Sequence, residues 1–462
     1  MTNNAYIVSA VRTPGGKKNG SLSLWHPADL GAKVLDELVL QTGIDPSLID
    51  DVIFGCVDQV GAQSGNVARN AILASSLPES VPGTSVDRQC GSSQQAIHFA
   101  IQAVMSGTQD VVIGGGVEIM SMVPIGASIK DGYEAGHGLP FDSEGMKTRY
   151  PGIFFSQFTG AELMAEKWNL TRQDLDNFAL SSHQKAMLAV EGKYFDREIL
   201  PIQAKNAEGK SDMIFVDEGI RYDASLEALA GLKSVTEGGV ITAGNASQIT
   251  DGAAAVMVCN EAGLKKIKTD PRARIVAISV VGDDPIMMLG GPIPASHKVL
   301  KAAGLTIDDI DLYEVNEAFA PVPLSWAIEL KADQNKLNVN GGAISIYALD
   351  PNRRGKTVWQ SFLCDEPETG SVPWAAIELS LEGSDLFVNC GMGVVFVLDP
   401  ATGTVRFAKR YKRVGQADNF GRRSGWTVNR LNFNGWSSDI VIPYGKQMVC
   451  FSSDTDSIEA LD

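Results

Sequence analysis

Short apolar runs alternate with helical patterns through the first 344 residues of the 462-residue chain, and this alternation restricts the fold more than any other feature. The runs at 51–55, 110–114 and 273–281 read as strands, and the segments between them carry apolar residues at helical spacing. Strands separated by helices are typically joined by crossover connections. The sequence therefore predicts an α/β fold with a mostly parallel sheet.

One helix–loop–strand unit occurs twice in this part of the chain. The run Lys33–Gly43 with Ile49–Val52 is echoed by Lys298–Gly304 with Ile310–Leu312. Gly43 and Gly304 are 261 residues apart, as are Ile49 and Ile310. This register favours two similar α/β halves. A chance match between two ordinary helix–strand units is the alternative.

An insertion is expected between the two halves. Residues from about 120 to 240 mix Gly- and Pro-rich loops with amphipathic helices such as 173–190. Such a segment is well suited to cover a binding site.

The chain changes character near residue 344. All five histidines precede this point, whereas four of the seven tryptophans follow it. Beyond it, similar pieces that contain Leu-Asp recur at 346–351, 395–400 and 457–462. They resemble blades of a quinoprotein-type β-propeller, so residues 345–462 are expected to form a β-rich, propeller-like segment.

The net charge and the cysteine spacing restrict the possible binding partners and the cellular compartment of the protein. The formal net charge of -16 argues against nucleic acid and anionic membranes as partners, and no apolar stretch is long enough for a membrane span. The six cysteines lack the spacing of a disulfide framework or a zinc site. The N-terminus lacks the pattern of a signal peptide. A cytoplasmic protein without a metal site is expected.

The strongest local signal is the run Asp87–Ser93, which contains Cys90 and precedes a helical pattern that stops at Gly107. Cys90 is expected in the first turn of that helix, where free backbone N–H groups favour a thiolate. A nucleophile is one interpretation and a buried structural cysteine is the other. His98 cannot serve as its base because eight residues of helix separate the two.

A second signal is Asn316, which directly follows the predicted strand 311–315. Ligands gather at the carboxyl ends of strands in α/β sheets, and the Asn316 amide is suited to donate a hydrogen bond to an oxyanion. Alternatively, Asn316 and Glu317 cap the next helix.

Five motifs lie at 87–93, 114–121, 242–247, 316–320 and 338–344. Taken together, these motifs closely resemble the thiolase family of the acetyl-CoA acyltransferase type. The resemblance implies a pseudo-symmetric layered fold with an N-terminal domain at 1–268, a loop insertion at about 120–240, and an incomplete C-terminal domain at 269–344. It also implies a homo-oligomer.

The same resemblance implies roles for individual residues. Cys90 would accept the acyl group as a thioester, and Asn316 would orient the water that binds the oxyanion. Arg221 would lie against the adenine of coenzyme A, and Ser247 would form a hydrogen bond with its pantetheine arm. Acyl-CoA and coenzyme A are then substrates, and neither a metal nor a redox cofactor is required.

Two departures from the family affect this expectation. The activating histidine of a Gly-His-Pro motif is absent, and no histidine follows His297. Cys390 only loosely matches the late cysteine that moves the α-proton in the family. Thiolase-type acyl transfer, strongly impaired, is therefore predicted. The alternatives are a non-catalytic CoA-binding remnant, a propeller-type binding module, and a fusion artefact.

Overall fold

The computed structural model describes residues 3–207, 212–267 and 269–340, and the backbone of strands between 345 and 461. The chain divides into two units. The first comprises Met1–His183, Phe195–Ile307 and Glu314–Leu337, and the second comprises Gln184–Tyr194, Asp308–Tyr313 and Asn338–Asp462.

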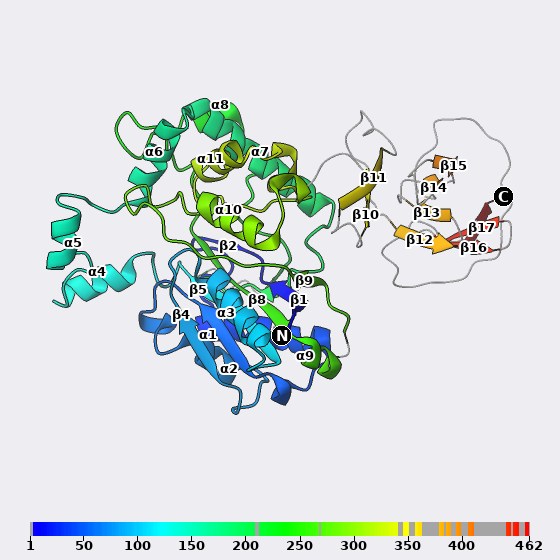
Figure 1. Ribbon diagram of the computed structural model, residues 1–462, viewed down its shortest axis with the longest axis horizontal. Coiled ribbons are helices and arrows are strands. Elements are labelled where there is room, and N and C mark those ends of the chain that lie inside the picture. Colours follow the sequence, from blue (N-terminus) through cyan, green and yellow to red (C-terminus); the bar gives the residue numbers. More distant parts are fainter. Residues whose placement is uncertain are drawn as a thin grey trace. The chain divides into compact units, whose positions relative to one another are not determined.

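A seven-stranded sheet forms the centre of the first unit, in the order β4-β3-β5-β8-β1-β9 with β2 against β8 (Figure 1). Strand β3 runs parallel to β4 and β5, whereas β8 is antiparallel to β5 and β1, and β9 is antiparallel to β1. The expectation of a mostly parallel sheet is therefore wrong. The chain enters β8 after the long insertion, not through a single crossover helix, so the parallel direction is not imposed. The strands are β1 Ala5–Arg12, β2 Gly16–Lys17, β3 Asp51–Gly55, β4 Gly83–Val86, β5 Val111–Ile119, β8 Thr250–Cys259 and β9 Ala273–Ile275.

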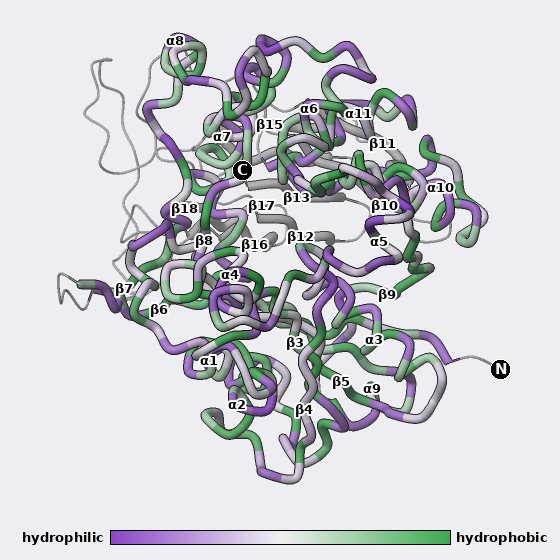
Figure 2. Tube along the Cα trace, turned by 90° about the vertical axis from the view of Figure 1, so that its left-hand side faces the viewer, coloured by the Kyte–Doolittle hydropathy of each residue, from purple (hydrophilic) through white to green (hydrophobic). Residues whose placement is uncertain are grey.

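Helices cover both faces of this sheet because its strands are apolar on both sides. Helices α1 (Pro27–Thr42) and α2 (Val67–Ala74) pack with Phe54 on one face. Helix α3 (Ser92–Ser106) packs with Ile53 on the other. Neighbouring strand residues point to opposite faces, and Figure 2 shows apolar colouring in β3 and β5. The layered α/β expectation is confirmed for this half.

The regular elements described in the insertion between β5 and β8 are mainly helices. Helix α7 (Arg172–Glu191) confirms the helix expected at 173–190. Figure 1 shows α4 and α5 extending away from the sheet. The other elements are α4 Ala127–Glu134, α5 Glu144–Arg149, α6 Gln157–Lys167, α8 Leu226–Ala230, β6 Ile202–Gln203 and β7 Met213–Ile214.

The repeated unit is visible in its helical part. Helix α10 (Pro292–Ala303) ends at Gly304 with φ +66°, as α1 ends at Gly43 with φ +60°. Each left-handed glycine is followed by a short 3₁₀ turn, η1 (Pro46–Leu48) or η3 (Ile307–Asp309).

The strands that follow in the repeat differ. After η1 the chain enters β3, but residues 311–315 belong to no named strand. Strand β9 likewise ends at Ile275 instead of continuing to residue 281. The remaining elements described up to residue 340 are α9 Glu261–Lys266, α11 Pro321–Leu330 and the 3₁₀ turns η2 Gly61–Gln63 and η4 Gln334–Lys336.

The described backbone beyond residue 344 consists of antiparallel strands. They pair as β10-β11, β12-β13-β14-β15 and β16-β17-β18. The expectation of strands is confirmed for these residues, and their arrangement as a propeller stays a prediction. Their bounds are β10 Ser345–Asp350, β11 Lys356–Phe362, β12 Glu378–Glu382, β13 Asp385–Asn389, β14 Val394–Leu398, β15 Val405–Arg410, β16 Ile440–Tyr444, β17 Gln447–Phe451 and β18 Ile458–Leu461.

Candidate active site

Cys90 is exposed on a tight turn between β4 and α3. It lies just before the Gly91 cap of α3, one step outside the first turn in which it was expected. Gln89 has a left-handed backbone with φ +48°, which is unusual for a residue with a side chain. The Ser92 hydroxyl donates to the Gln89 carbonyl at 2.6 Å and accepts from the Arg88 N–H at 2.8 Å. These bonds hold the turn that presents the thiol.

Glycines on two strands allow the start of α3 to approach the sheet closely. A Cβ atom on Gly55 would lie 2.2 Å from the backbone nitrogen of Ser93, and one on Gly116 would lie 2.1 Å from the Ser93 hydroxyl. Gly55 and Gly116 are paired in the β3–β5 ladder. The glycines of β3 and β5 thus place the Cys90 turn at the sheet, a close-approach role that glycine alone can fill.

A cavity of about 310 Å³ opens beside the Cys90 turn. Its walls come from the turn itself, from β3 and β5, from the beginning of β8, and from the end of β1. The lining residues are Arg12, Thr13, Gly15, Gly55, Val57, Gln89, Cys90, Ser92, Ser93, Gly116, Val117, Glu118 and 250–254. The thiol therefore faces a space formed by elements far apart in sequence.

Arg12 supplies the cationic group of this cavity wall, but two carboxylates already hold it. Its Nε atom lies 2.7 Å from Glu198 Oε1, and its Nη1 atom lies 2.7 Å from Asp217 Oδ1. Burial opposes the charged guanidinium, yet the hydrogen bonds and charges of Asp217 and Glu198 outweigh it and raise the pKa of Arg12. Asp217 also accepts the Gly15 N–H at 2.7 Å.

Two further carboxylates line the cavity, and sequence reasoning did not select them. Glu118 accepts the backbone N–H groups of Val57 and Asp58, each at 3.0 Å, so it is fixed as a structural acceptor. Asp251 is fully buried and accepts the Ser121 N–H at 2.8 Å. Burial raises the pKa of Asp251. One sequence signal pointed to Glu118, which belongs to the motif 114–121, and none pointed to Asp251.

The loop that carries Ser247 lies against the segment that carries Asn316. The Ser247 N–H donates to the Ala318 carbonyl at 2.9 Å, and the Ala320 N–H donates to the Asn245 carbonyl at 2.9 Å. Both Ser247 and Asn316 are exposed. The structure thus brings these two predicted residues into neighbouring loops.

Arg221 joins the same neighbourhood through its backbone. Its N–H donates to His183 Nδ1 at 3.3 Å, and the Gln248 side chain donates to the Gly219 carbonyl at 2.7 Å. Burial and the Arg221 charge lower the pKa of His183, against the opposing charge of Glu317. Arg221 itself is exposed.

The predicted site residues therefore fall into two groups. Cys90 lines the cavity, whereas Arg221, Ser247 and Asn316 share adjoining loops and are not among its lining residues. The loop of Ser247 leads within three residues to Thr250, which does line the cavity. Cys390 lies outside the described residues.

Comparisons with known proteins identify the family of the chain. Residues 5–262 match the family model "Thiolase, N-terminal domain", and residues 269–347 match "Thiolase, C-terminal domain". The chain belongs to the thiolase family, and it is an acyltransferase of the thiolase type.

Individual relatives define the likeness further. A steroid 3-ketoacyl-CoA thiolase of Mycobacterium tuberculosis is 49% identical over 343 residues, which are 74% of this chain and 83% of the relative. A 3-oxoadipyl-CoA/3-oxo-5,6-dehydrosuberyl-CoA thiolase of Escherichia coli is 40% identical over 74% of this chain and 88% of the relative. The crystal structure of the Bacillus anthracis acetyl-CoA acetyltransferase superposes with a TM-score of 0.66 at 37% identity, covering 74% of this chain and 86% of that one.

These relatives favour the enzymatic interpretation over a non-catalytic one. In the parts of the chain that the structure describes, no helix has the length and apolar character needed to cross a membrane. Within the same residues, no three His, Cys, Asp or Glu side chains gather as metal ligands would.

Proposed function

We propose that the chain acts on 3-ketoacyl-CoA and coenzyme A through a thioester on Cys90. The observation that carries this proposal is the exposed thiol on the turn before α3, beside a cavity. The names of the Mycobacterium tuberculosis and Escherichia coli relatives support the 3-ketoacyl-CoA substrate class.

The proposed reaction runs in two steps. The Cys90 thiolate attacks the 3-keto carbon, and a carbon–sulfur bond forms. The bond between carbons 2 and 3 then breaks, and its electron pair leaves with acetyl-CoA as an enolate, which takes up a proton. The thiolate of coenzyme A attacks the acyl-enzyme, which releases the shortened acyl-CoA and restores Cys90. Coenzyme A is a substrate here, and the steps require no metal or redox cofactor.

Three further residues take roles by resemblance to the family. Asn316 orients the water that stabilises the oxyanion. Ser247 forms a hydrogen bond with the pantetheine arm, and Arg221 lies against the adenine. The contacts between the loops of Ser247 and Asn316 support their joint assignment to one acyl-CoA site.

The same proposal includes low turnover. The Gly-His-Pro histidine is missing from the sequence, and the assignment of Cys390 as the proton-moving thiol rests on a loose motif. A positioned general base typically contributes about 10²- to 10⁴-fold to the rate. Acylation of Cys90 should persist, whereas condensation and thiolysis should be close to background.

The organisation of the chain completes the proposal. Residues 1–268 form an N-terminal thiolase domain, residues 269–344 form an incomplete C-terminal domain, and residues 345–462 form a propeller-like segment. The recurring Leu-Asp pieces support the last assignment. The family resemblance supports a homo-oligomer, and the unpatterned cysteines support a reducing, cytoplasmic location.

A steady-state assay of acetoacetyl-CoA thiolysis tests the proposed function. Loss of the enolate absorbance should be near background for the unaltered chain and no faster for Cys90→Ala. Ordinary thiolase turnover that disappears in Cys90→Ala would show that the missing basic groups are supplied elsewhere in the chain. Turnover that survives in Cys90→Ala would contradict the role of Cys90.

A further inference from the structure

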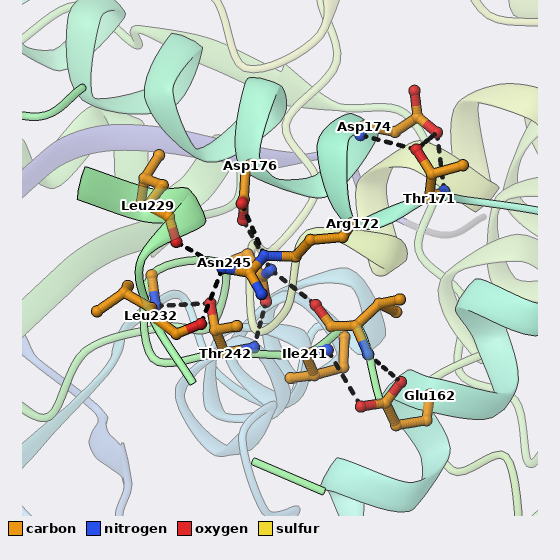
Figure 3. A network of polar contacts seen from close by, with 12 residues as sticks. Glu162, Thr171, Arg172, Asp174, Asp176, Leu229, Leu232, Ile241, Thr242 and Asn245 are labelled. Carbon is orange, nitrogen blue, oxygen red and sulfur yellow. Dashed lines mark hydrogen bonds and ion pairs between the residues drawn. The ribbon is translucent and has the colours of Figure 1, made fainter. Parts of the chain in front are cut away.

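A buried charge in the insertion is connected to the loop of Ser247. Asp176, on α7, is 4% exposed. Its Oδ2 atom accepts from Arg172 Nε at 2.7 Å, and its Oδ1 atom accepts from Asn245 Nδ2 at 3.1 Å (Figure 3). Arg172 also donates to the carbonyls of Leu229 and Leu232. Asp176 therefore links a cation on its own helix to a side chain 69 residues away in sequence.

Asn245 uses its whole side chain in this network. Its Nδ2 atom also donates to the Val240 carbonyl at 3.1 Å, and its Oδ1 atom accepts the Thr242 N–H at 2.8 Å. A carboxylate and a carbonyl can only accept, and an N–H can only donate, so the orientation of the amide is determined. An aspartate at position 245 would have the same shape but an oxygen in place of Nδ2. That oxygen would face two acceptors, the Asp176 carboxylate and the Val240 carbonyl.

Glu162 is a second acidic residue that holds the turn containing Asn245, residues 240–245. Glu162, on α6, accepts the N–H groups of Val240 and Ile241 at 3.0 and 3.1 Å, and the Thr236 hydroxyl at 2.9 Å. The turn is thus held between two helices of the insertion, as Figure 3 shows.

The main chain of the same loop reaches the segment of Asn316. The Asn245 carbonyl accepts the Ala320 N–H, and two residues later Ser247 donates to Ala318, both at 2.9 Å. A displacement of Asn245 would therefore move Ser247 relative to Asn316.

We infer that Asp176, acting through Asn245, is a positioning residue that sets the geometry of the coenzyme A site. The inference rests on the proposed function, because Ser247 and Asn316 are assigned to that site there. A buried carboxylate is costly unless it is fully paired. Here the Asp176 carboxylate is paired by Arg172 and selects an amide at position 245, which keeps the binding loop in one arrangement before the ligand arrives.

The decisive variant is Asn245→Asp, which keeps the shape and removes the donor. The change leaves buried acceptors without a donor, so the dissociation constant for coenzyme A should rise about 5- to 150-fold. Calorimetric titration is done at a temperature where circular dichroism shows every variant folded. The double variant Asp176→Asn, Asn245→Asp restores one donor and one acceptor between these positions, so part of the lost affinity should return.

Asn260, at the end of β8, offers a matched control. It is 1% exposed, its Nδ2 atom donates to Asp110 Oδ1 at 2.9 Å, and its Oδ1 atom accepts the N–H groups of Ala262 and Gly263 at 2.9 Å. Asn260→Asp makes the same chemical change away from the loop of Ser247. It should lower stability and leave the dissociation constant for coenzyme A unchanged.

The outcomes separate the inference from the proposed function. Coenzyme A binding that Asn245→Asp leaves unchanged, or that Asn260→Asp weakens equally, would overturn the inference alone. No binding by the unaltered chain would overturn the proposed function and the inference with it. If Asn245→Asp does not fold, Asp176→Asn is titrated instead, and unchanged affinity in that variant counts against the inference.

Discussion

At the scale of single residues, Cys90 differs sharply from the other cysteines whose surroundings are described. Cys56 and Cys259 are buried in the core, and Cys90 is exposed. Burial and the nearby Glu261 charge raise the pKa of Cys259 to about 12. Burial also raises the pKa of Cys56, and the nearby charge of Glu118 raises it further. A pKa near 12 leaves on the order of 10³-fold less thiolate than in an ordinary cysteine of pKa about 8.5.

This contrast predicts selective alkylation. Brief, substoichiometric iodoacetamide treatment followed by peptide mass spectrometry should label Cys90 at least about 10²-fold faster than Cys56 or Cys259. Comparable labelling of either buried cysteine in the folded protein would contradict the placement of Cys90.

Two histidines predict how stability depends on pH. Burial lowers the pKa of His98, and the nearby charge of Arg88 lowers it further. Burial and the charge of Arg221 lower the pKa of His183 in the same way. The folded chain then binds fewer protons than the unfolded chain, so stability falls as the pH drops below about 6.5.

The measurement is a series of denaturant unfolding curves between about pH 7.5 and 5, a range chosen around that value. The midpoint should fall on acidification, and the fall should be shallower in His98→Gln. An equal fall in His98→Gln would show that His98 does not contribute.

At the scale of elements, the packing of α3 against the sheet determines where Cys90 lies. Gly55→Ala would force a Cβ atom against the backbone of Ser92 and Ser93, and such overpacking typically costs about 1–3 kcal/mol. We expect the free energy of unfolding to fall by that amount. We also expect the rate at which iodoacetamide labels Cys90 to change.

Gly132, in α4, is the matched control for this substitution because its added Cβ atom would meet no neighbour. Gly132→Ala should stabilise the helix by up to about 1 kcal/mol. If the two substitutions changed the unfolding free energy alike in chemical denaturation, the close approach of α3 to β3 would have no energetic importance.

How far the elements could be predicted depends on the range of the interactions that form them. Helix α7 follows from local apolar spacing, and the end of α3 at Gly107 follows from the need for a left-handed residue. The direction of β8 could not be predicted, since it depends on how a long insertion returns to the sheet. The hydrogen bond between Asp176 and Asn245 could not be predicted either, because neither residue belongs to a local pattern that identifies its partner.

At the scale of the whole molecule, the chain is predicted to contain separately folding parts. The family match ends at residue 347, and the second unit includes Asn338–Asp462. Limited proteolysis should cut between about 344 and 385 and leave the first part intact. A single protease-resistant product that retains both parts would contradict this division.

The central claim is that Cys90 exchanges an acyl group with coenzyme A even though making and breaking the carbon–carbon bond are impaired. The most direct measurement is peptide mass spectrometry of the full chain after incubation with acetyl-CoA, with Cys90→Ala alongside. We predict one acetyl group on the peptide that contains Cys90, lost on addition of free coenzyme A and absent from Cys90→Ala. An unmodified Cys90, or acetylation that persists in Cys90→Ala, would contradict the account.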